Sequence, residues 1–228
     1  MRGRLLTVAM ILVLVIPGFV LAKGIDLYSL FPNLTLGVDP NGADSVYAVC
    51  GGQSANHMDV LVYIGTDNAD PNDYIQGVEL ELLATADQGG VTLDDTEATT
   101  YAGSAVSSWF IQSVAVEGGN PSAFPLEVKL GAVDSSAAPL AAGDHLFATL
   151  RFNISSPTNI TLNGTTITNG PATLVTTLAN GYNPSVLGTA CGPVVPTLSE
   201  WGLIIFGVVL LGGIVWYVRR HRPATVAA

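Results

Sequence analysis

The chain has 228 residues, 49% of them hydrophobic, and a formal net charge of −10. Residues 23–195 hold seventeen acidic residues but only three basic ones, Lys23, Lys129 and Arg151. Such an acidic surface repels phosphate backbones and anionic head groups, so the composition argues against nucleic acid as a partner.

The N-terminal segment has the features of a secretory signal peptide. Arg2 and Arg4 precede an apolar run that ends in Val20-x-Ala22, the small-residue pattern at which such peptides are cut. We therefore expect residues 1–22 to be removed after Ala22, with an uncleaved N-terminal anchor as the alternative. Both interpretations predict that the rest of the chain is exported.

Residues 23–191 have the pattern of an exported domain built from β-strands. Apolar and polar residues alternate in several short stretches, as in strands with one buried and one solvated face. The residues predicted to face inward are Val60, Val62, Ile64, Val78, Leu80, Leu82, Leu146, Ala148, Leu150 and Phe152. Eight to ten such strands predict an all-β fold, an antiparallel β-sandwich with one core. The nearest helical candidate, residues 95–109, is rich in Thr and Ser, which favour helices poorly.

Cys50 and Cys191 are the two cysteines of the chain, and both lie in the exported segment. Because exported proteins meet an oxidising compartment, we expect a disulfide between them, with two unpaired thiols as the alternative. In the simple chain-entropy model such a long loop stabilises the fold by about 4–5 kcal/mol. No Cys/His spacing indicates a zinc site.

One polar loop offers a candidate metal site. Asp67, Asp70 and Asp73 lie close together with Asn68 and Asn72 between them, and all five supply the hard oxygen ligands that calcium prefers. The spacing is not that of an EF-hand, and the same residues are common in solvated turns. Calcium is therefore the one cofactor that the sequence suggests, and a plain loop between strands is the alternative.

Candidate catalytic residues are few. Glu79 and Glu81 lie opposite an apolar stripe, which predicts a solvated sheet face rather than an acid–base pair. Ser54 and His57 lack the Gly-x-Ser-x-Gly context of a serine hydrolase. Trp109 with Phe110, and likewise Tyr101, are expected in the core, with stacking on a sugar ring as the alternative. We predict no catalytic residue and no enzyme.

The succession of strands resembles the cohesin-type and carbohydrate-binding-type β-sandwich over residues 45–191. The stretches that carry the similarity are VLVYIGTDNADPNDYIQGVELELLAT, AAPLAAGDHLFATLRFNIS and NITLNGTTITN. The resemblance implies a nine-strand jelly-roll sandwich that binds proteins or glycans. It carries over no functional residue, because no ligand motif maps onto this chain.

The C-terminal end predicts a membrane anchor. Residues 202–218 are seventeen residues without a charge, near the lower length limit for crossing a bilayer, and a Pro-containing spacer, 192–201, precedes them. The tail 219–228 begins with two arginines, which predicts a cytoplasmic C-terminus and a body outside the cytoplasm. Trp201 at one edge and Trp216 at the other fit the membrane–water interface. The alternative is a buried core helix.

The residues before this run are similar to the bacterial IPTL-CTERM sorting signal, a relative of the PEP-CTERM tails. The matching positions are Val195, Pro196, Thr197, Leu198, Ser199, Glu200, Trp201 and Gly202, with Val195 in place of the first Ile. The resemblance implies recognition by an exosortase, a membrane-embedded enzyme of cysteine-transpeptidase type. This enzyme would cleave near the motif and pass the body from the inner membrane to the cell surface or extracellular matrix.

Together these features predict an exported surface or matrix protein that is an exosortase substrate and not itself an enzyme. Its role would be structural or adhesive, with a surface glycan or a protein as partner. The alternative is a secreted or membrane-anchored carbohydrate-active enzyme, which needs two carboxylates facing each other across a groove.

Overall fold

The computed structural model describes residues 24–134, 138–166, 170–192 and 198–220. Three predicted features lie outside the described residues: the signal peptide with its cleavage position after Ala22, the motif residues Val195, Pro196 and Thr197, and the end of the tail, 221–228. The chain divides into two compact units, Met1–Pro193 and Val194–Ala228, and each is described by itself.

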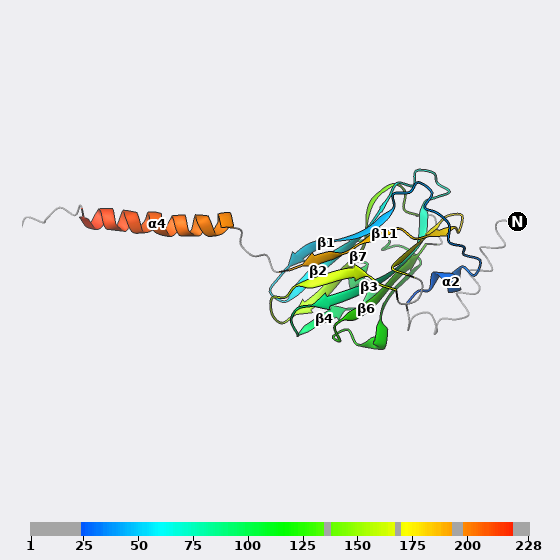
Figure 1. Ribbon diagram of the computed structural model, residues 1–228, viewed down its shortest axis with the longest axis horizontal. Coiled ribbons are helices and arrows are strands. Elements are labelled where there is room, and N and C mark those ends of the chain that lie inside the picture. The colour runs from blue at the N-terminus through cyan, green and yellow to red at the C-terminus, as the bar shows by residue number, and fades with distance from the viewer. Residues whose placement is uncertain (1–23, 135–137, 167–169, 193–197, 221–228) are drawn as a thin grey trace, which may run out of the picture. The chain divides into compact units, whose positions relative to one another are not determined.

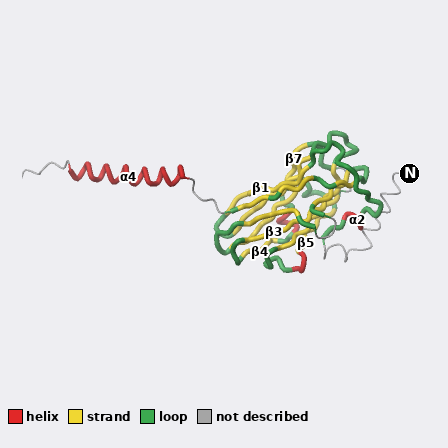
Figure 2. Tube along the Cα trace, in the orientation of Figure 1, coloured by secondary structure: helices red, strands yellow, loops and turns green. Residues whose placement is uncertain are grey.

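Strands make up most of the first unit (Figure 1), and its helices are single turns (Figure 2). The strands are β1 (Ser45–Gln53), β2 (His57–Thr66), β3 (Ile75–Ala86), β4 (Val91–Asp94), β5 (Ile111–Val116), β6 (Leu126–Val133), β7 (Gly143–Ile154), β8 (Ile160–Gly164), β9 (Ala172–Thr176), β10 (Gly181–Tyr182), β11 (Ser185–Leu187) and β12 (Thr189–Cys191). The helical turns are α2 (Leu27–Leu30), α3 (Glu97–Thr100) and the 3-10 turn η1 (Glu117–Gly119).

The twelve described strands form two sheets. The first has the order β11-β1-β2-β7-β4, and the second has the order β10-β9-β3-β6-β5, with β8 pairing to both β3 and β12. Every paired strand is antiparallel to its neighbour except β11, which runs parallel to β1. The all-β prediction is confirmed. The strands outnumber the eight to ten expected because β10, β11 and β12 have only two or three residues each.

One hydrophobic core lies between the two sheets, which makes the first unit a β-sandwich. Its members from β2 and β3 include the predicted inward-facing residues Val60, Val62, Ile64, Val78, Leu80 and Leu82. Burying a side chain of this size stabilises the fold by about 1.5–3 kcal/mol. The alternation of these two strands therefore predicted their core faces correctly.

Strand β7 departs from simple alternation. Its register with β2 shifts between Val62 and Tyr63, which marks a β-bulge. Phe147 and Ala148 are consequently both buried, and Leu146, predicted to face inward, is only half-buried. A bulge places one extra residue in a strand and reverses the facing of the residues beyond it, so the period-2 pattern fails at this point.

Residues 24–34, which we call the N-terminal strap, cover the outer face of the second sheet. Ile25 and Leu27 of the strap are fully buried in a small cluster with Val133 of β6 and Val175 of β9. The centre of this sheet is thus buried on both faces. The sequence pattern did not indicate a cover, because the strap is short and lies far from β3 and β6 in the chain.

A glycine in the second sheet makes room for the strap. A Cβ atom on Gly131 of β6 would lie 2.6 Å from the Cβ of Ile25, closer than real Cβ contacts. A Cβ atom on Gly77 of β3 would lie 3.5 Å from a methyl carbon of Leu27, which is an ordinary van der Waals contact. The absence of a side chain at Gly131 therefore lets the strap approach the sheet backbone closely.

The helical candidate at residues 95–109 contains only one helical turn, α3. The remainder forms turns, in which Tyr101 and Trp109 are buried in the core as predicted. The next residue, Phe110, is 57% exposed, which corrects its predicted place in the core. The Tyr101 hydroxyl donates to the carbonyl groups of Ser113 and Gly131. Tyr101 and Trp109 therefore close the core at one side.

The second unit contains helix α4, Leu198–Arg220. The helix begins four residues before the predicted run 202–218. Within the part of the chain that the structure describes, no helix is both long and apolar enough to cross a membrane.

Candidate functional site

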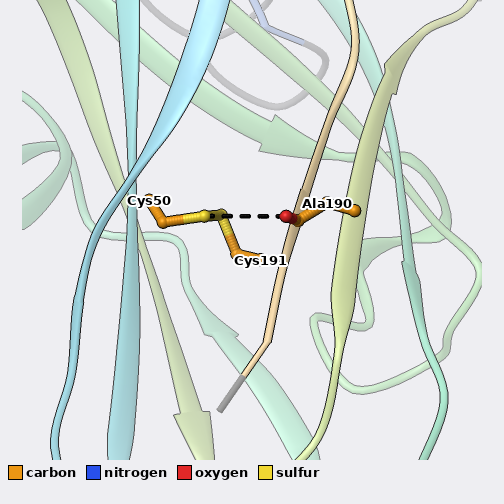
Figure 3. The surroundings of a disulfide bond; sticks show 3 residues. All are labelled: Cys50, Ala190 and Cys191. Atoms are coloured by element: carbon orange, nitrogen blue, oxygen red, sulfur yellow. Dashed lines mark hydrogen bonds between the residues drawn. A yellow bond between two sulfur atoms is a disulfide. The ribbon is translucent and has the colours of Figure 1, made fainter. Parts of the chain in front are cut away.

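The two cysteines join the sheets near the C-terminal end of the body. Cys50 on β1 and Cys191 on β12 form a disulfide with a Cα–Cα distance of 5.5 Å, and Figure 3 shows their side chains pointing toward each other. The sulfur of Cys50, which carries no proton once bonded, lies 3.7 Å from the carbonyl oxygen of Ala190. The bond ties β12, which otherwise pairs with β8 over three residues, to the opposite sheet.

Glu79 and Glu81 are buried, which corrects the prediction of a solvated sheet face. Glu81 faces Lys129 directly across the β3–β6 pairing, and Glu79 is two residues further along the same face. The Lys129 Nζ lies 2.7 Å from Glu79 Oε1 and 3.5 Å from Glu81 Oε1. We call these three side chains the ion cluster.

The N-terminal strap closes the ion cluster from solvent. The backbone N–H of Leu27 donates to Glu79 Oε2 at 2.8 Å. The three charged side chains are at most 6% exposed. Carboxylates that are bridged by an ammonium and sealed from water have no access to a substrate, so this pair does not provide an acid–base site. The opposite charges on two predicted strands were the available signal, but the sequence does not fix the register that brings them together.

The structure places the predicted calcium ligand Asp67 with different partners. Among the described residues, the one group of three potential ligands within 4.8 Å of one another is Asp39, Asp44 and Asp67. Asp70 lies elsewhere in the loop, where its carboxylate accepts hydrogen bonds from the backbone and side-chain nitrogens of Asn72. Asp73 belongs to the same turn, with its N–H bonded to the Asp70 carbonyl. The structure therefore does not bring Asp67, Asp70 and Asp73 together.

Hydrogen bonds inside the protein already occupy the aspartate group. Asp44 accepts from the N–H of Asp67, the side-chain amide of Asn68 and the hydroxyl of Tyr182. Asp39 accepts from the backbone nitrogens of Asn41, Gly42 and Asp44. These bonds account for the position of the carboxylates without a metal, and calcium stays a prediction.

Burial sets the electrostatics of this group. It raises the pKa of Asp44 above its ordinary value, although the hydrogen bonds from Tyr182 and Asp67 act in the opposite direction. The pKa of the Tyr182 hydroxyl also rises, chiefly through burial and then through the neighbouring Asp44. Both groups favour their neutral forms more than they would in water.

A cavity of about 500 Å³ opens beside the aspartate group. It is lined by Leu36, Gly37, Val38, Asp39, Gly42, Ala43, Asp44, Asn183 and Ser185. The size is that of a small-ligand site, and the wall combines apolar surface with two carboxylates.

Ser54 and His57 lie together in the turn between β1 and β2. The Ser54 hydroxyl is 2.7 Å from His57 Nδ1, and the Ser54 N–H donates to the His57 carbonyl. The nearest orienting group is the amide oxygen of Asn56, 3.3 Å from the same ring nitrogen. The Ser54 hydroxyl and the Asn56 amide oxygen thus both lie near the same ring nitrogen, Nδ1, in an exposed hairpin turn. In a nucleophile–base–acid relay, by contrast, the two ring nitrogens of the histidine have separate partners.

The outer face of the first sheet carries aromatic and aliphatic side chains. Tyr47 and Tyr63 face each other across β1 and β2 and stack with ring centroids 5.5 Å apart and planes 10° apart. Leu187 of β11 is the cross-strand neighbour of Tyr47 on the other side, and both Leu187 and Val49 are exposed. This face, unlike that of the second sheet, has no strap over it among the described residues.

Solved structures with a similar arrangement of strands include several cohesins. A non-cellulosomal cohesin from Archaeoglobus fulgidus is 16% identical, with a TM-score of 0.39, over 68% of this chain and 93% of the cohesin. The cohesin module of a family 33 glycoside hydrolase from Clostridium perfringens is 9% identical, with a TM-score of 0.40, over 66% and 96%. A type I cohesin from Pseudobacteroides cellulosolvens is 10% identical, with a TM-score of 0.34, over 67% and 95%.

No curated protein matches the chain. A family model, the IPTL-CTERM motif, matches residues 195–222. The match includes all eight positions that the sequence pattern singled out, Val195 to Gly202, together with the uncharged run and the arginines that follow. The chain therefore carries an IPTL-CTERM motif at its C-terminal end, after an all-β sandwich.

Proposed function

We propose that this protein is an exported surface or matrix protein whose C-terminal segment is a sorting signal for an exosortase-type enzyme. The observation that carries the proposal is the IPTL-CTERM motif at residues 195–222. The enzyme would bind the segment around Pro196-Thr197-Leu198, cut the chain near it, and release the body for transfer to its final place outside the cell. In this role the protein is a substrate.

We also propose that residues 202–218 hold the precursor in the inner membrane until it is cut. The run has no charge, and arginines follow it at positions 219, 220 and 222. In α4 the large apolar side chains from Ile204 to Tyr217 are exposed, as in a helix whose partner is lipid rather than a protein core. Arginines at the end of such a run favour the cytoplasmic side, so the body would lie outside the cytoplasm.

The body would contribute structure or adhesion. The stacked Tyr47–Tyr63 pair and the exposed Leu187 offer an apolar strip for a surface glycan or a protein. The seventeen acidic residues of the segment disfavour anionic partners. The pair Glu79 and Glu81 does not favour a carbohydrate-active enzyme, since both side chains lie sealed beneath the strap.

The sorting proposal is tested by two matched proline variants expressed in the native host. Pro196→Ala changes the motif, whereas Pro223→Ala changes a proline just beyond the matched residues. We expect Pro196→Ala to accumulate as a longer, membrane-associated precursor and Pro223→Ala to be processed as the wild type is. Immunoblotting of cell fractions measures the size and location of each variant. Equal processing of the two variants would argue against recognition of the motif.

A further inference from the structure

The ion cluster holds a lysine amine against two carboxyl groups. Lys129 Nζ lies 2.7 Å from Oε1 of Glu79 and 3.5 Å from Oε1 of Glu81. Since a carboxyl C–O bond is about 1.2 Å long, the Cδ atom of Glu79 cannot lie more than about 4 Å from this nitrogen. That limit is close to the separation of about 3–3.5 Å from which two bound groups react.

The sheet and the start of the N-terminal strap fix the three side chains in this arrangement. Glu81 faces Lys129 across the β3–β6 pairing, and Glu79 lies two residues along the same strand. Gly24 packs on the stem of Lys129, since a Cβ atom added there would lie 3.1 Å from Cγ and 3.2 Å from Cδ. Groups held in contact react much faster than free ones, because the entropy of bringing them together has already been lost.

The N-terminal strap supplies two further features that favour attack of the amine on a carboxyl carbon. The N–H of Leu27 donates to Oε2 of Glu79 at 2.8 Å, whereas Lys129 contacts the other oxygen, Oε1. A donor at Oε2 stabilises the negative charge that develops on this oxygen during the attack. Ile25 and Leu27 are fully buried and the three charged side chains are at most 6% exposed, so water has little access to the reacting atoms.

We propose that Lys129 and Glu79 condense into an amide that covalently joins β6 to β3, with Glu81 as the proton carrier. No external substrate reaches the cluster, but both reactants belong to the chain itself. Condensation replaces two buried charges by a neutral amide, which favours the product because charges are costly to bury. Glu79 is the acyl group because it is the nearer carboxylate and the one that accepts the Leu27 N–H. Unlike the disulfide, this link withstands reduction.

The reaction needs only the three side chains of the cluster. The Lys129 ammonium transfers a proton to Oε1 of Glu79, which gives a neutral amine and a neutral carboxyl group. The lone pair of Nζ then forms a bond to Cδ, and the electron pair of the C=O bond moves onto Oε2. Glu81 takes a proton from the nitrogen and delivers it to Oε1, and the Cδ–Oε1 bond breaks as water leaves. The products are an amide, one water molecule and ionised Glu81.

Tryptic mapping of the purified protein, denatured, reduced and alkylated, tests the bond. Lys129 is the only lysine or arginine in residues 24–150, and trypsin does not cut after a lysine whose amine has become an amide. We expect residues 24–151 in a single peptide that is lighter than its sequence by one water molecule, with the branch at Glu79. Cleavage after Lys129, an uncut peptide of full mass, or a branch at another residue would overturn the proposal. Processing at either end of the chain does not affect this peptide.

Variants identify the nucleophile and the proton carrier. Lys129→Arg keeps the positive charge but lacks the amine, so its peptides should have their full mass. Glu81→Gln should slow the condensation by about 100-fold or more, so that trypsin cuts the freshly purified variant after Lys129. Glu117→Gln, at an exposed position in η1, should cross-link as fully as the wild type. Full cross-linking in Glu81→Gln would contradict the role of Glu81, and the map of the wild type decides the bond itself even where a variant does not fold.

Discussion

Among single residues, Lys129 is the buried cation of the body that the structure describes. It is buried, it bridges two buried carboxylates, and the N-terminal strap lies over it. The other described basic residue of the body, Arg151, pairs with Asp59 at a site where both side chains are partly exposed. The two pairs therefore allow a buried and a solvated interaction to be compared in one protein.

Replacing Lys129 by methionine should lower the free energy of unfolding by about 3–5 kcal/mol, because it leaves two carboxylates buried without their cation. Replacing Arg151 by methionine should cost much less, because water screens the partly exposed pair. Urea denaturation of both variants measures the difference. A similar loss in the two variants would contradict the account of the ion cluster.

Two aspartates should affect stability in opposite directions with pH. Burial raises the pKa of Asp44 in the folded protein above its unfolded value of about 3.9. The stability that Asp44 contributes is therefore present below the unfolded pKa and is lost as the pH rises through the folded pKa. The pKa of Asp94 is lowered, first by the hydroxyl of Thr96, so its contribution is present above the unfolded value and is lost as the pH falls through the folded one. NMR titration of the side-chain carboxyl carbons checks both directions. A lower pKa for Asp44 than for Asp94 would contradict them.

Among the elements, the N-terminal strap determines which sheet faces are accessible to solvent. It covers the second sheet and leaves the stacked tyrosines of the first sheet uncovered by any strap that the structure describes. Its position depends on the missing side chain at Gly131 of β6. The strap can therefore pack closely on β6 only while position 131 has no side chain, and adding one methyl group there tests this packing.

Gly131→Ala should displace the strap, because the new Cβ would lie 2.6 Å from the Cβ of Ile25 and neither atom is at the end of a flexible side chain. We expect a loss of about 1–3 kcal/mol in unfolding free energy, with faster proteolysis within residues 24–34. Gly89→Ala, where a Cβ meets nothing within 4 Å, is the control and should change stability by no more than about 0.5 kcal/mol. Equal behaviour of the two variants would mean that the strap does not pack on Gly131.

The predictable elements were those with a simple period. Strands β2 and β3 show their core faces in the alternation of Val60, Val62, Val78 and Leu80, and all four are buried. The bulge opposite Tyr63 was not predictable from alternation, because a bulge is a property of the pairing between two strands.

The same limit applied to the candidate sites. Glu79 and Glu81 were predicted to be solvated because the sequence of β3 does not indicate that residues 24–34 pack over it. Asp67 meets Asp39 and Asp44 through the pairing of β1 with β2, which places the residues before one strand beside those after the other. At both sites the sequence supplies the residue types but not the long-range register that brings them together.

At the scale of the whole molecule, the disulfide marks where the body ends. It joins β1 in one sheet to β12 in the other, across a sequence separation of 141 residues, and β12 is the last strand before the spacer. The C-terminal unit begins at Val194, three positions after Cys191. The segment that the proposed enzyme cuts therefore follows closely on a covalently closed domain.

The double variant Cys50→Ala/Cys191→Ala should lower the free energy of unfolding by about 4 kcal/mol, since the unfolded chain loses the constraint of a long closed loop. Denaturation of the oxidised wild type, the reduced wild type and the double variant measures this effect. The reduced protein should resemble the double variant. A change below about 0.5 kcal/mol would show that the two cysteines are not paired in the purified protein.

The central claim is that the C-terminal segment is a signal that is cut off. The direct measurement is the intact mass and the C-terminal peptide of the protein recovered from the surface or matrix of its native host. The account predicts a chain that ends near Pro196-Thr197-Leu198 and lacks residues 203–228, and it predicts the full-length C-terminus in a host without its exosortase. Surface protein that still ends at Ala228 in the unmodified host would contradict it and would identify the segment as a permanent anchor.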